Sequence, residues 1–141
     1  AIATHPRIHA LGFLPDIRPA LRLANVLVLP SYREGFPNSV LQAGAMGLPV
    51  IATDINGSNE IIEPGFNGWL VPARTVEPLR NAMLAAMRTD PETSLRMGRQ
   101  ARQRIIQRFE QGQHLQRMVG FYRDCLTPSN ATHAKKQRSH V

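Results

Sequence analysis

The sequence predicts an α/β fold in which a parallel β-sheet is flanked by helices. The first observation is the segment from Asn25 to Asp54, which has the pattern of a strand, a loop, a helix and a second strand. The second is the composition: 43% of the residues are hydrophobic and only 6% are aromatic, so the apolar content is mainly aliphatic. Strands that are buried on both faces of a parallel sheet have this character. A chain of 141 residues is long enough for one domain with a sizeable core.

The two strands of this segment are short apolar runs, Val26–Leu29 and Pro49–Thr53. Their length and β-branched content predict buried strands. Between them, Asn38 is expected to cap a helix that stops at Gly47. Two parallel strands joined by a helix place the loop after the first strand at the carboxyl edge of the sheet. This edge is where α/β folds bind their ligands.

The residues before this segment predict one more strand and a short helix. Arg7–Phe13 has the pattern of a strand, and Leu14 follows it in a strand-end loop. Asp16 can cap a short helix that contains Pro19 in its first turn, where proline is tolerated. The helix is expected to end near Asn25. Leu14 can lie beside the loop after the next strand or be an ordinary core leucine, and the composition leaves both alternatives open.

Turn signals follow Thr53, at Asn56-Gly57 and again at residues 65–68. Asn59–Ile62 is expected to form one helical turn, and Trp69–Val71 a last short strand. Glu60 can be a pocket residue, but a capping or solvated role is favoured for it.

Three amphipathic helices are expected after this strand. Thr75 can cap the first, and Asp90-Pro91-Glu92 begins the second in the usual order of cap, proline and acid. The methionines on these helices are interpreted as core residues. The apolar positions at helical spacing are Leu79, Ala82, Met83, Ala86 and Met87 in the first helix, Leu95, Gly98, Ala101, Ile105 and Phe109 in the second, and Leu115, Met118, Val119, Tyr122 and Leu126 in the third.

The charge divides the chain into a lobe, residues 1–126, and a basic tail, residues 127–141, that is expected to be disordered. The formal net charge is +7, and it comes from the arginine-rich residues 88–108 and from the tail. Such charge suggests nucleic-acid binding as one alternative, but no recognition motif accompanies it, so no nucleic acid is expected as a partner. Basic helices more often face solvent or an anionic membrane.

Several kinds of site are excluded or disfavoured by the residue types. The single cysteine, Cys125, excludes an internal disulfide and fits a reducing, cytoplasmic setting. No metal and no cofactor are expected, because the histidines lack the spacing of metal ligands. Neither a nucleophile-elbow serine nor a complete glycine-rich phosphate motif is present. The histidines are His5, His9, His114, His133 and His140.

The loop after the first strand of the 25–54 segment carries the most informative residues. Glu34 offers a carboxylate that can accept hydrogen bonds from sugar hydroxyls, and Gly35 permits close approach of the backbone. The first amides of the helix that follows form a possible phosphate site. Gln42 lies one turn further along, so it is expected to border the same pocket as Asn38. On the residues alone, a sugar–phosphate site and a plain polar loop remain equally open.

The segment PSYREGFPNSVLQAGAMGLPVIATDINGSNEIIEPGFNGWLVP resembles the donor-binding segment of retaining glycosyltransferases of family 4, which are also described as glycosyl transferases group 1. In that family a Glu-Gly-Phe sequence is followed by a second Glu eight positions after the first. This chain has Glu34, Gly35 and Phe36, but Gln42 in place of the second Glu. The resemblance extends from about His9 to Leu126, and it is strongest to bacterial enzymes that build surface polysaccharides.

The resemblance implies a Rossmann-like parallel sheet with flanking helices, namely the C-terminal lobe of a GT-B fold that is truncated at its N-terminus. It also implies a role for each matching residue in binding a nucleotide-diphosphate sugar. Leu14 would pack on the base, Gln42 would contact the ribose and Glu34 the donor sugar. Glu34 is in addition a weak catalytic candidate, because family 4 has no agreed protein nucleophile. The residues of the loop that faces the diphosphate would be Phe36, Pro37, Asn38 and Ser39, and Gly35 would be a further substrate-binding residue.

The activity that this implies is the transfer of a sugar, from a UDP-sugar by resemblance, to a polysaccharide or a lipid-linked glycan. The N-terminal lobe that binds the acceptor in GT-B enzymes has no counterpart in the sequence, so this chain alone is expected to be inactive. The alternative is a non-catalytic fragment that binds a sugar nucleotide. A cytoplasmic location is expected, with a possible peripheral contact at the inner face of the membrane.

Overall fold

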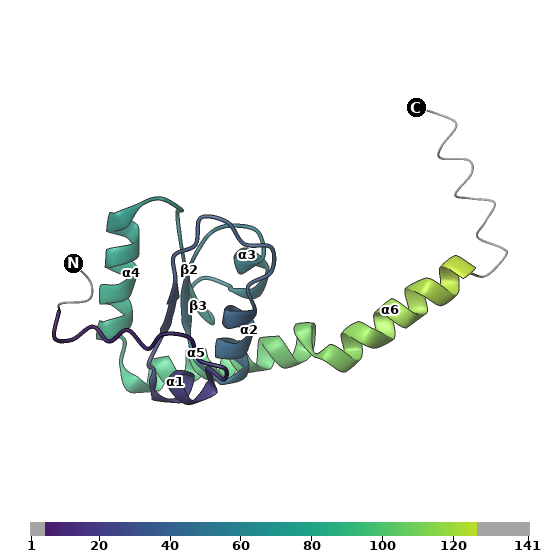
Figure 1. Cartoon of the computed structure of the whole chain (residues 1–141), viewed down its shortest axis with the longest axis horizontal. Coiled ribbons are helices and arrows are strands. Elements are labelled where there is room, and N and C mark those ends of the chain that lie inside the picture. Colours follow the sequence, from purple (N-terminus) through teal and green to yellow (C-terminus); the bar gives the residue numbers. More distant parts are fainter. Residues whose placement is uncertain (1–4, 127–141) are drawn as a thin grey trace, which may run out of the picture.

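The computed structural model describes residues 5–126, which form a parallel three-stranded sheet with helices on both faces (Figure 1). The strands lie in the order β1 (Leu27–Leu29), β2 (Val50–Thr53) and β3 (Gly68–Val71). The predicted α/β fold is therefore confirmed, and all three of these strands were expected from the sequence to within a residue. The helices are α1 (Arg18–Leu23), α2 (Asn38–Ala45), α3 (Ser58–Ile61), α4 (Val76–Arg88), α5 (Pro91–Phe109) and α6 (Gln111–Leu126).

Alternating side chains of the strands supply two hydrophobic cores, one on each face of the sheet. Val50 and Ala52 of β2 pack with Val40 of α2 on one face. Ile51, between them in sequence, packs with Ala82 of α4 on the other face. Figure 1 shows α4 on one side of the sheet and α2 and α3 on the other. Only β2 is buried at every position; the residues of β1 are half-buried, because β1 lies at the edge of the described sheet.

Helix α5 crosses α2 at a point where both helices have small residues. A Cβ atom at Gly98 of α5 would overlap the carbonyl oxygen of Gly47, two residues after the end of α2. A Cβ at Gly44 of α2 would lie 2.8 Å from the side chain of Ile105. On the predicted apolar face of α5, Gly98 and Ala101 are buried and Ile105 is half-buried, whereas Leu95 is 65% exposed, contrary to the prediction. Glycine is required at Gly98 because no side chain fits there.

The strand predicted at Arg7–Phe13 is wrong. Residues 8–13 form no strand, and Phe13 is 91% exposed. A strand needs a neighbour with which to exchange backbone hydrogen bonds. Within residues 5–126 the sheet has only the order β1-β2-β3, and residues 8–13 pair with none of these strands.

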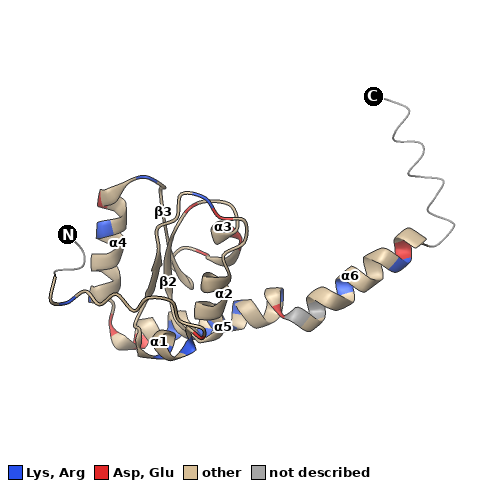
Figure 2. Cartoon of the chain, in the orientation of Figure 1, with Lys and Arg blue, Asp and Glu red and all other residues tan. Residues whose placement is uncertain are grey.

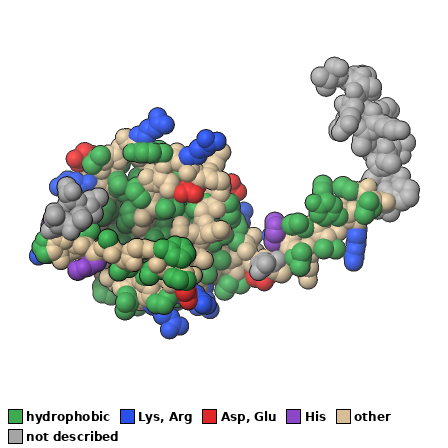
Figure 3. All heavy atoms as spheres, in the orientation of Figure 1, with side chains coloured by type: hydrophobic (Ala, Val, Ile, Leu, Met, Phe, Trp, Pro, Cys, Tyr) green, Lys and Arg blue, Asp and Glu red, His purple; other side chains and the backbone are tan. Residues whose placement is uncertain are grey.

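The predicted apolar face of α6 and part of that of α4 are not buried, although Leu79, Ala82 and Ala86 of α4 pack against the sheet. Met83 and Met87 of α4 are exposed, and the five apolar positions predicted for α6 are each at least 41% exposed. Helix α6 extends away from the body of the domain (Figures 1 and 3), so most of its apolar surface is not covered by the described elements. Helical spacing predicts which side chains share a face, but burial requires a second surface against that face. Met97 of α5 is the methionine that the core does bury.

The helix ends follow the sequence in part. The Asp90 carboxylate accepts a 2.8 Å hydrogen bond from the Thr93 amide, as a capping residue should, and this bond holds the pKa of Asp90 below its ordinary value. Asn38 does not cap α2, because Pro37 takes the cap position and Asn38 is the first helical residue. Thr75 takes the expected cap position of α4, but its side chain does not cap the helix, because the hydroxyl donates to the Pro72 carbonyl.

Basic residues are spread over several elements in the view of Figure 2. No helix within residues 5–126 is long and apolar enough to cross a membrane. The tail predicted at residues 127–141 lies outside the described residues.

Candidate functional site

The loop at residues 31–37, which we call the Glu34 loop, leaves the carboxyl end of β1. Its first residue is held by the neighbouring strand, because the Thr53 hydroxyl donates a 2.5 Å hydrogen bond to the Ser31 carbonyl. The Ser31 hydroxyl in turn donates to Oε1 of Glu34 at 2.6 Å. Oε2 of Glu34 makes no hydrogen bond within the described part of the chain, and so can accept one from a ligand.

A cavity of about 730 Å³ opens beside Glu34. One wall is the Glu34 loop, from Tyr32 to Gly35, and the other is formed by Ile55 and Asn56 after β2. The guanidinium of Arg74, in the loop after β3, lies 5.9 Å from the centre of the Tyr32 ring, within the range of a cation–π contact. The loops after β1 and β2 therefore line this cavity at the carboxyl edge of the sheet, and the loop after β3 reaches Tyr32 in its wall.

The first turn of α2 begins at the end of the Glu34 loop. Pro37 is buried, and its carbonyl accepts hydrogen bonds from the amides of Val40 and Leu41. The amides of Asn38 and Ser39 have no acceptor among residues 5–126, as is usual for the first amides of a helix. Free amides at a helix N-terminus favour an anionic group such as phosphate.

The residues predicted to bind substrate do not all face one cavity. Glu34 and Gly35 line the cavity described above, whereas Phe36 and Asn38 line a second one of about 1040 Å³ between α2, α5 and α6. Gln42 lines a third, of about 210 Å³, together with residues 15–18.

The expectation that Asn38 and Gln42 border the same pocket is therefore wrong. Asn38 faces the cavity beside the C-terminal end of α5 and the start of α6, while Gln42 faces the segment before α1. The half-buried Leu14 directly precedes this segment in the chain. Ser39 is half-buried in the first turn of α2.

Sequence reasoning missed several residues of the Glu34 cavity. Ser31 and Thr53 orient the loop, and Ile55 and Asn56 form the second wall. The second wall could have been predicted from the sequence, because the residues after β2 must reach the same carboxyl edge of the sheet as the residues after β1. For Glu60 a capping or solvated role was favoured over that of a pocket residue; Glu60 is exposed, and it also lines the second cavity, with Phe36 and Asn38.

The part of the chain that the structure describes contains no group of three or more His, Cys, Asp or Glu side chains placed to hold a metal ion.

Comparison with known proteins identifies the family. The model of the family described as glycosyl transferases group 1 matches residues 1–89. This chain belongs to that family. The match contains the Glu34 loop, the whole of α2 and all three strands, so it covers the carboxyl edge of the sheet where the cavity lies.

One relative of this chain is the UDP-Gal:alpha-D-GlcNAc-diphosphoundecaprenol alpha-1,3-galactosyltransferase of Escherichia coli, which is 31% identical to it over 120 residues. The alignment covers 85% of this chain but 30% of the galactosyltransferase. The chain thus spans about a third of the length of the curated relatives it matches, or less.

Solved structures place the fold among the GT-B glycosyltransferases. The sucrose-phosphate synthase of Thermosynechococcus elongatus is 31% identical, with a TM-score of 0.73, over 77% of this chain and 27% of the synthase. HepE of Anabaena, solved in complex with UDP-glucose, has a TM-score of 0.79 at 24% identity, over 86% of this chain and 34% of HepE. The predicted Rossmann-like parallel sheet with flanking helices is confirmed by these similarities.

Proposed function

We propose that this group 1 glycosyltransferase chain binds the donor of a sugar-transfer reaction, a nucleotide-diphosphate sugar with UDP as the nucleotide. The observation that carries the proposal is the Glu34 loop, because it combines a carboxylate with one unused oxygen and a helix N-terminus with unused amides. A carboxylate suits sugar hydroxyls, and helix amides suit phosphate. The family and the UDP-glucose complex of HepE support the same substrate class.

In this proposal each predicted residue contacts one part of the donor. Glu34 and Gly35 lie against the sugar, and residues 36–39 lie against the diphosphate. Gln42 contacts the ribose and Leu14 the base. Because Glu34, Asn38 and Gln42 line three different cavities, this assignment requires an extended ligand that passes across the first turn of α2.

The complete reaction needs an acceptor site as well as a donor site. We propose transfer with retention of configuration to a polysaccharide or lipid-linked glycan. The E. coli relative supports this, since its name specifies a diphosphoundecaprenol-linked acceptor. Glu34 is a donor-site residue here and only a weak catalytic candidate. The 141-residue chain is expected to bind donor without turnover, and an assay of donor hydrolysis separates this from an active enzyme.

Two further parts of the proposal concern the surroundings of the reaction. It proceeds without a metal ion or cofactor, with the α2 amides as partners of the diphosphate. It takes place in the cytoplasm, with a peripheral contact between the protein and the inner face of the membrane. The exposed apolar residues of α6 and the arginines of α5 support that contact.

Replacing Glu34 by alanine tests the donor site directly. The variant should bind a UDP-sugar about tenfold more weakly, because a hydrogen bond between a charged group and a sugar hydroxyl is lost. Binding of UDP itself should be unchanged, because UDP has no sugar for Glu34 to contact. Isothermal titration of both ligands measures the two affinities.

Glu77→Ala is the control, since Glu77 is an exposed carboxylate of α4 that pairs with Arg80. It should leave both affinities unchanged. Equal binding of the UDP-sugar by wild type and Glu34→Ala would refute the assignment of Glu34.

Replacing Gln42 by glutamate tests the ribose contact. A carboxylate accepts hydrogen bonds from two hydroxyls and makes stronger bonds than a neutral amide. Gln42→Glu should therefore tighten binding by about 1 kcal/mol, or roughly fivefold to tenfold. UDP and the UDP-sugar should gain equally, because both contain the ribose.

The matched control is Gln103→Glu, which adds the same charge at an exposed position on α5. It should have no effect in the same titrations. Unaltered affinity in Gln42→Glu would show that residue 42 does not touch the nucleotide.

A further inference from the structure

We propose that the turn at residues 56–58, and Gly57 in particular, sets the position of the Glu34 loop and is a positioning element for donor binding. This inference rests on the proposed function of the loop. Neither the sequence motif nor the cavity lining points to Gly57. The evidence is the packing of its backbone against three consecutive loop residues.

Gly57 is buried, and its φ angle of 83° lies in the left-handed region. A Cβ atom there would be 2.5 Å from the carbonyl oxygen of Gly35 and 2.9 Å from Cδ of Pro37. The same atom would lie 3.1 Å from Cα of Phe36. The loop backbone therefore rests directly on the Cα of Gly57, at the point between Glu34 and the first amides of α2.

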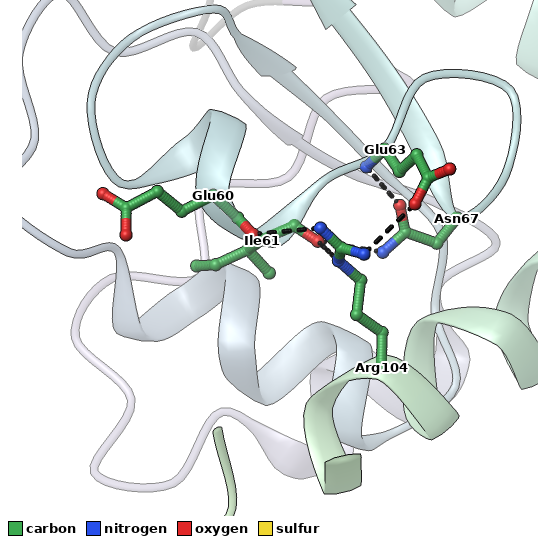
Figure 4. Close-up of polar contacts among 5 residues, drawn as sticks. All are labelled: Glu60, Ile61, Glu63, Asn67 and Arg104. Carbon is green, nitrogen blue, oxygen red and sulfur yellow. Dashed lines mark hydrogen bonds and ion pairs between the residues drawn. The ribbon is translucent and has the colours of Figure 1, made fainter. Parts of the chain in front are cut away.

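The turn has little freedom to move away from the loop. Ser58 and Ile61 of α3 are almost completely buried. The other end of α3 is held by α5, because Arg104 donates to the carbonyl oxygens of Ile61 and Glu60 at 2.8 and 3.2 Å (Figure 4). Arg104 and Glu63 also form an ion pair in the same view. The turn is thus fixed to the body of the domain through α3, on the side away from the loop.

The loop is the side that can move. Gly35 and Phe36, in its middle, are exposed, and the hydrogen bonds of the loop lie at its two ends, around Ser31 and at the Pro37 carbonyl. A methyl group at residue 57 needs an ordinary contact of at least 3.4 Å, so the Gly35 carbonyl would have to move by about 1 Å. A shift of that size also displaces Glu34 and the amides of Asn38 and Ser39. Displacements of this order in a binding site reduce function strongly.

The test compares Gly57→Ala with Gly65→Ala. Gly65 has a φ of 76° and nothing within 4 Å of its Cβ position, so its substitution has the backbone strain without the contact. Both variants should lose thermal stability. In the absence of ligand, only Gly57→Ala should shift the NMR signals of the amides of residues 34–36, 38 and 39. It alone should bind a UDP-sugar at least tenfold more weakly, measured by titration.

Unchanged loop amide signals in Gly57→Ala, or changes no larger than those in Gly65→Ala, would overturn the proposal. If the wild-type chain binds neither UDP nor a UDP-sugar, the proposed function fails, and the amide signals of the ligand-free variants still decide whether Gly57 positions the loop. Affinity lost equally in both variants would mean that Gly57 matters only for stability.

A second variant covers the case in which Gly57→Ala does not fold. Arg104→Lys retains the charge but replaces the several donors of the guanidinium by one ammonium group, which loosens α3 instead of crowding the loop. The loop amide signals should shift or broaden in this variant. They should not change in Arg102→Lys, an exposed position on the same helix. Unchanged loop signals in a folded Arg104→Lys variant would contradict the proposal.

Discussion

Gly98→Ala is expected to destabilise the domain strongly, although it adds only one methyl group. The new Cβ would overlap the carbonyl oxygen of Gly47, which is a backbone atom and cannot change rotamer to avoid it. Relief requires α5 to move away from α2, where Ala101 and Ile105 also pack. Overpacking of this kind costs about 3 kcal/mol, which corresponds to a fall in Tm of roughly 10 °C for a domain of this size.

Thermal and urea unfolding, followed by circular dichroism, measure this loss. Gly120→Ala is the matched control, because Gly120 lies within α6 and a Cβ there meets nothing within 4 Å. That variant should be as stable as wild type or slightly more stable, since alanine favours helix by about 1 kcal/mol over glycine. A Gly98→Ala protein with an unchanged Tm would show that α5 does not lie as close to α2 as the structure has it.

Arg104→Ala is expected to destabilise the domain substantially, though less than Gly98→Ala. Arg104 lies on α5 with its side chain only 16% exposed, and it donates to two carbonyl oxygens at the end of α3. Figure 4 shows how the guanidinium fills the space between Ile61, Glu63 and Asn67. Loss of these charge-assisted bonds and of the packing around them should cost about 2 kcal/mol.

Two companion variants separate the carbonyl contacts from the ion pair. Glu63→Gln removes only the ion pair, whose carboxylate is 56% exposed, and should cost less than about 1 kcal/mol. Arg99→Ala, at an exposed position on the same helix, should change stability by less than about 0.5 kcal/mol. Urea unfolding at low and high salt separates the two contributions, because the hydrogen bonds to the carbonyl oxygens should persist in salt that screens the ion pair with Glu63. An Arg104→Ala loss that disappears at high salt would contradict it.

Helix α3 links this stability prediction to the donor site. Its C-terminal end is bound by Arg104, and its N-terminal end begins at the turn that supports the Glu34 loop. This four-residue helix contributes to the core through Ile61, and the residue at its N-cap, Gly57, is the one that we propose positions the Glu34 loop. Variants of Arg104 are therefore expected to change both the stability of the domain and the position of the Glu34 loop.

The sequence by itself was sufficient to predict the strands and helices around the site. β2 is buried at all four positions, and a short aliphatic run between Pro49 and Asp54 permits little else. The second helix of the C-terminal part begins at Asp90 because the cap, proline and acid are consecutive in the chain. The parallel pairing of β1 with β2 and the Glu34 loop at the carboxyl edge follow from the connection of strand, helix and parallel strand.

The tertiary structure alone decided features that depend on residues far apart in sequence. The side chain of Arg104 binds Ile61, 43 positions earlier, and no local pattern distinguishes it from the other arginines of α5. Residues 8–13 have the composition of a strand, but pairing depends on a neighbour that these residues do not have in the described sheet. Spacing placed Met118 and Tyr122 on one face of α6, yet burial depends on what lies against that face. Local sequence fixes the conformation of a segment, whereas contacts, burial and the shape of the cavities are set by the surfaces that the fold brings together.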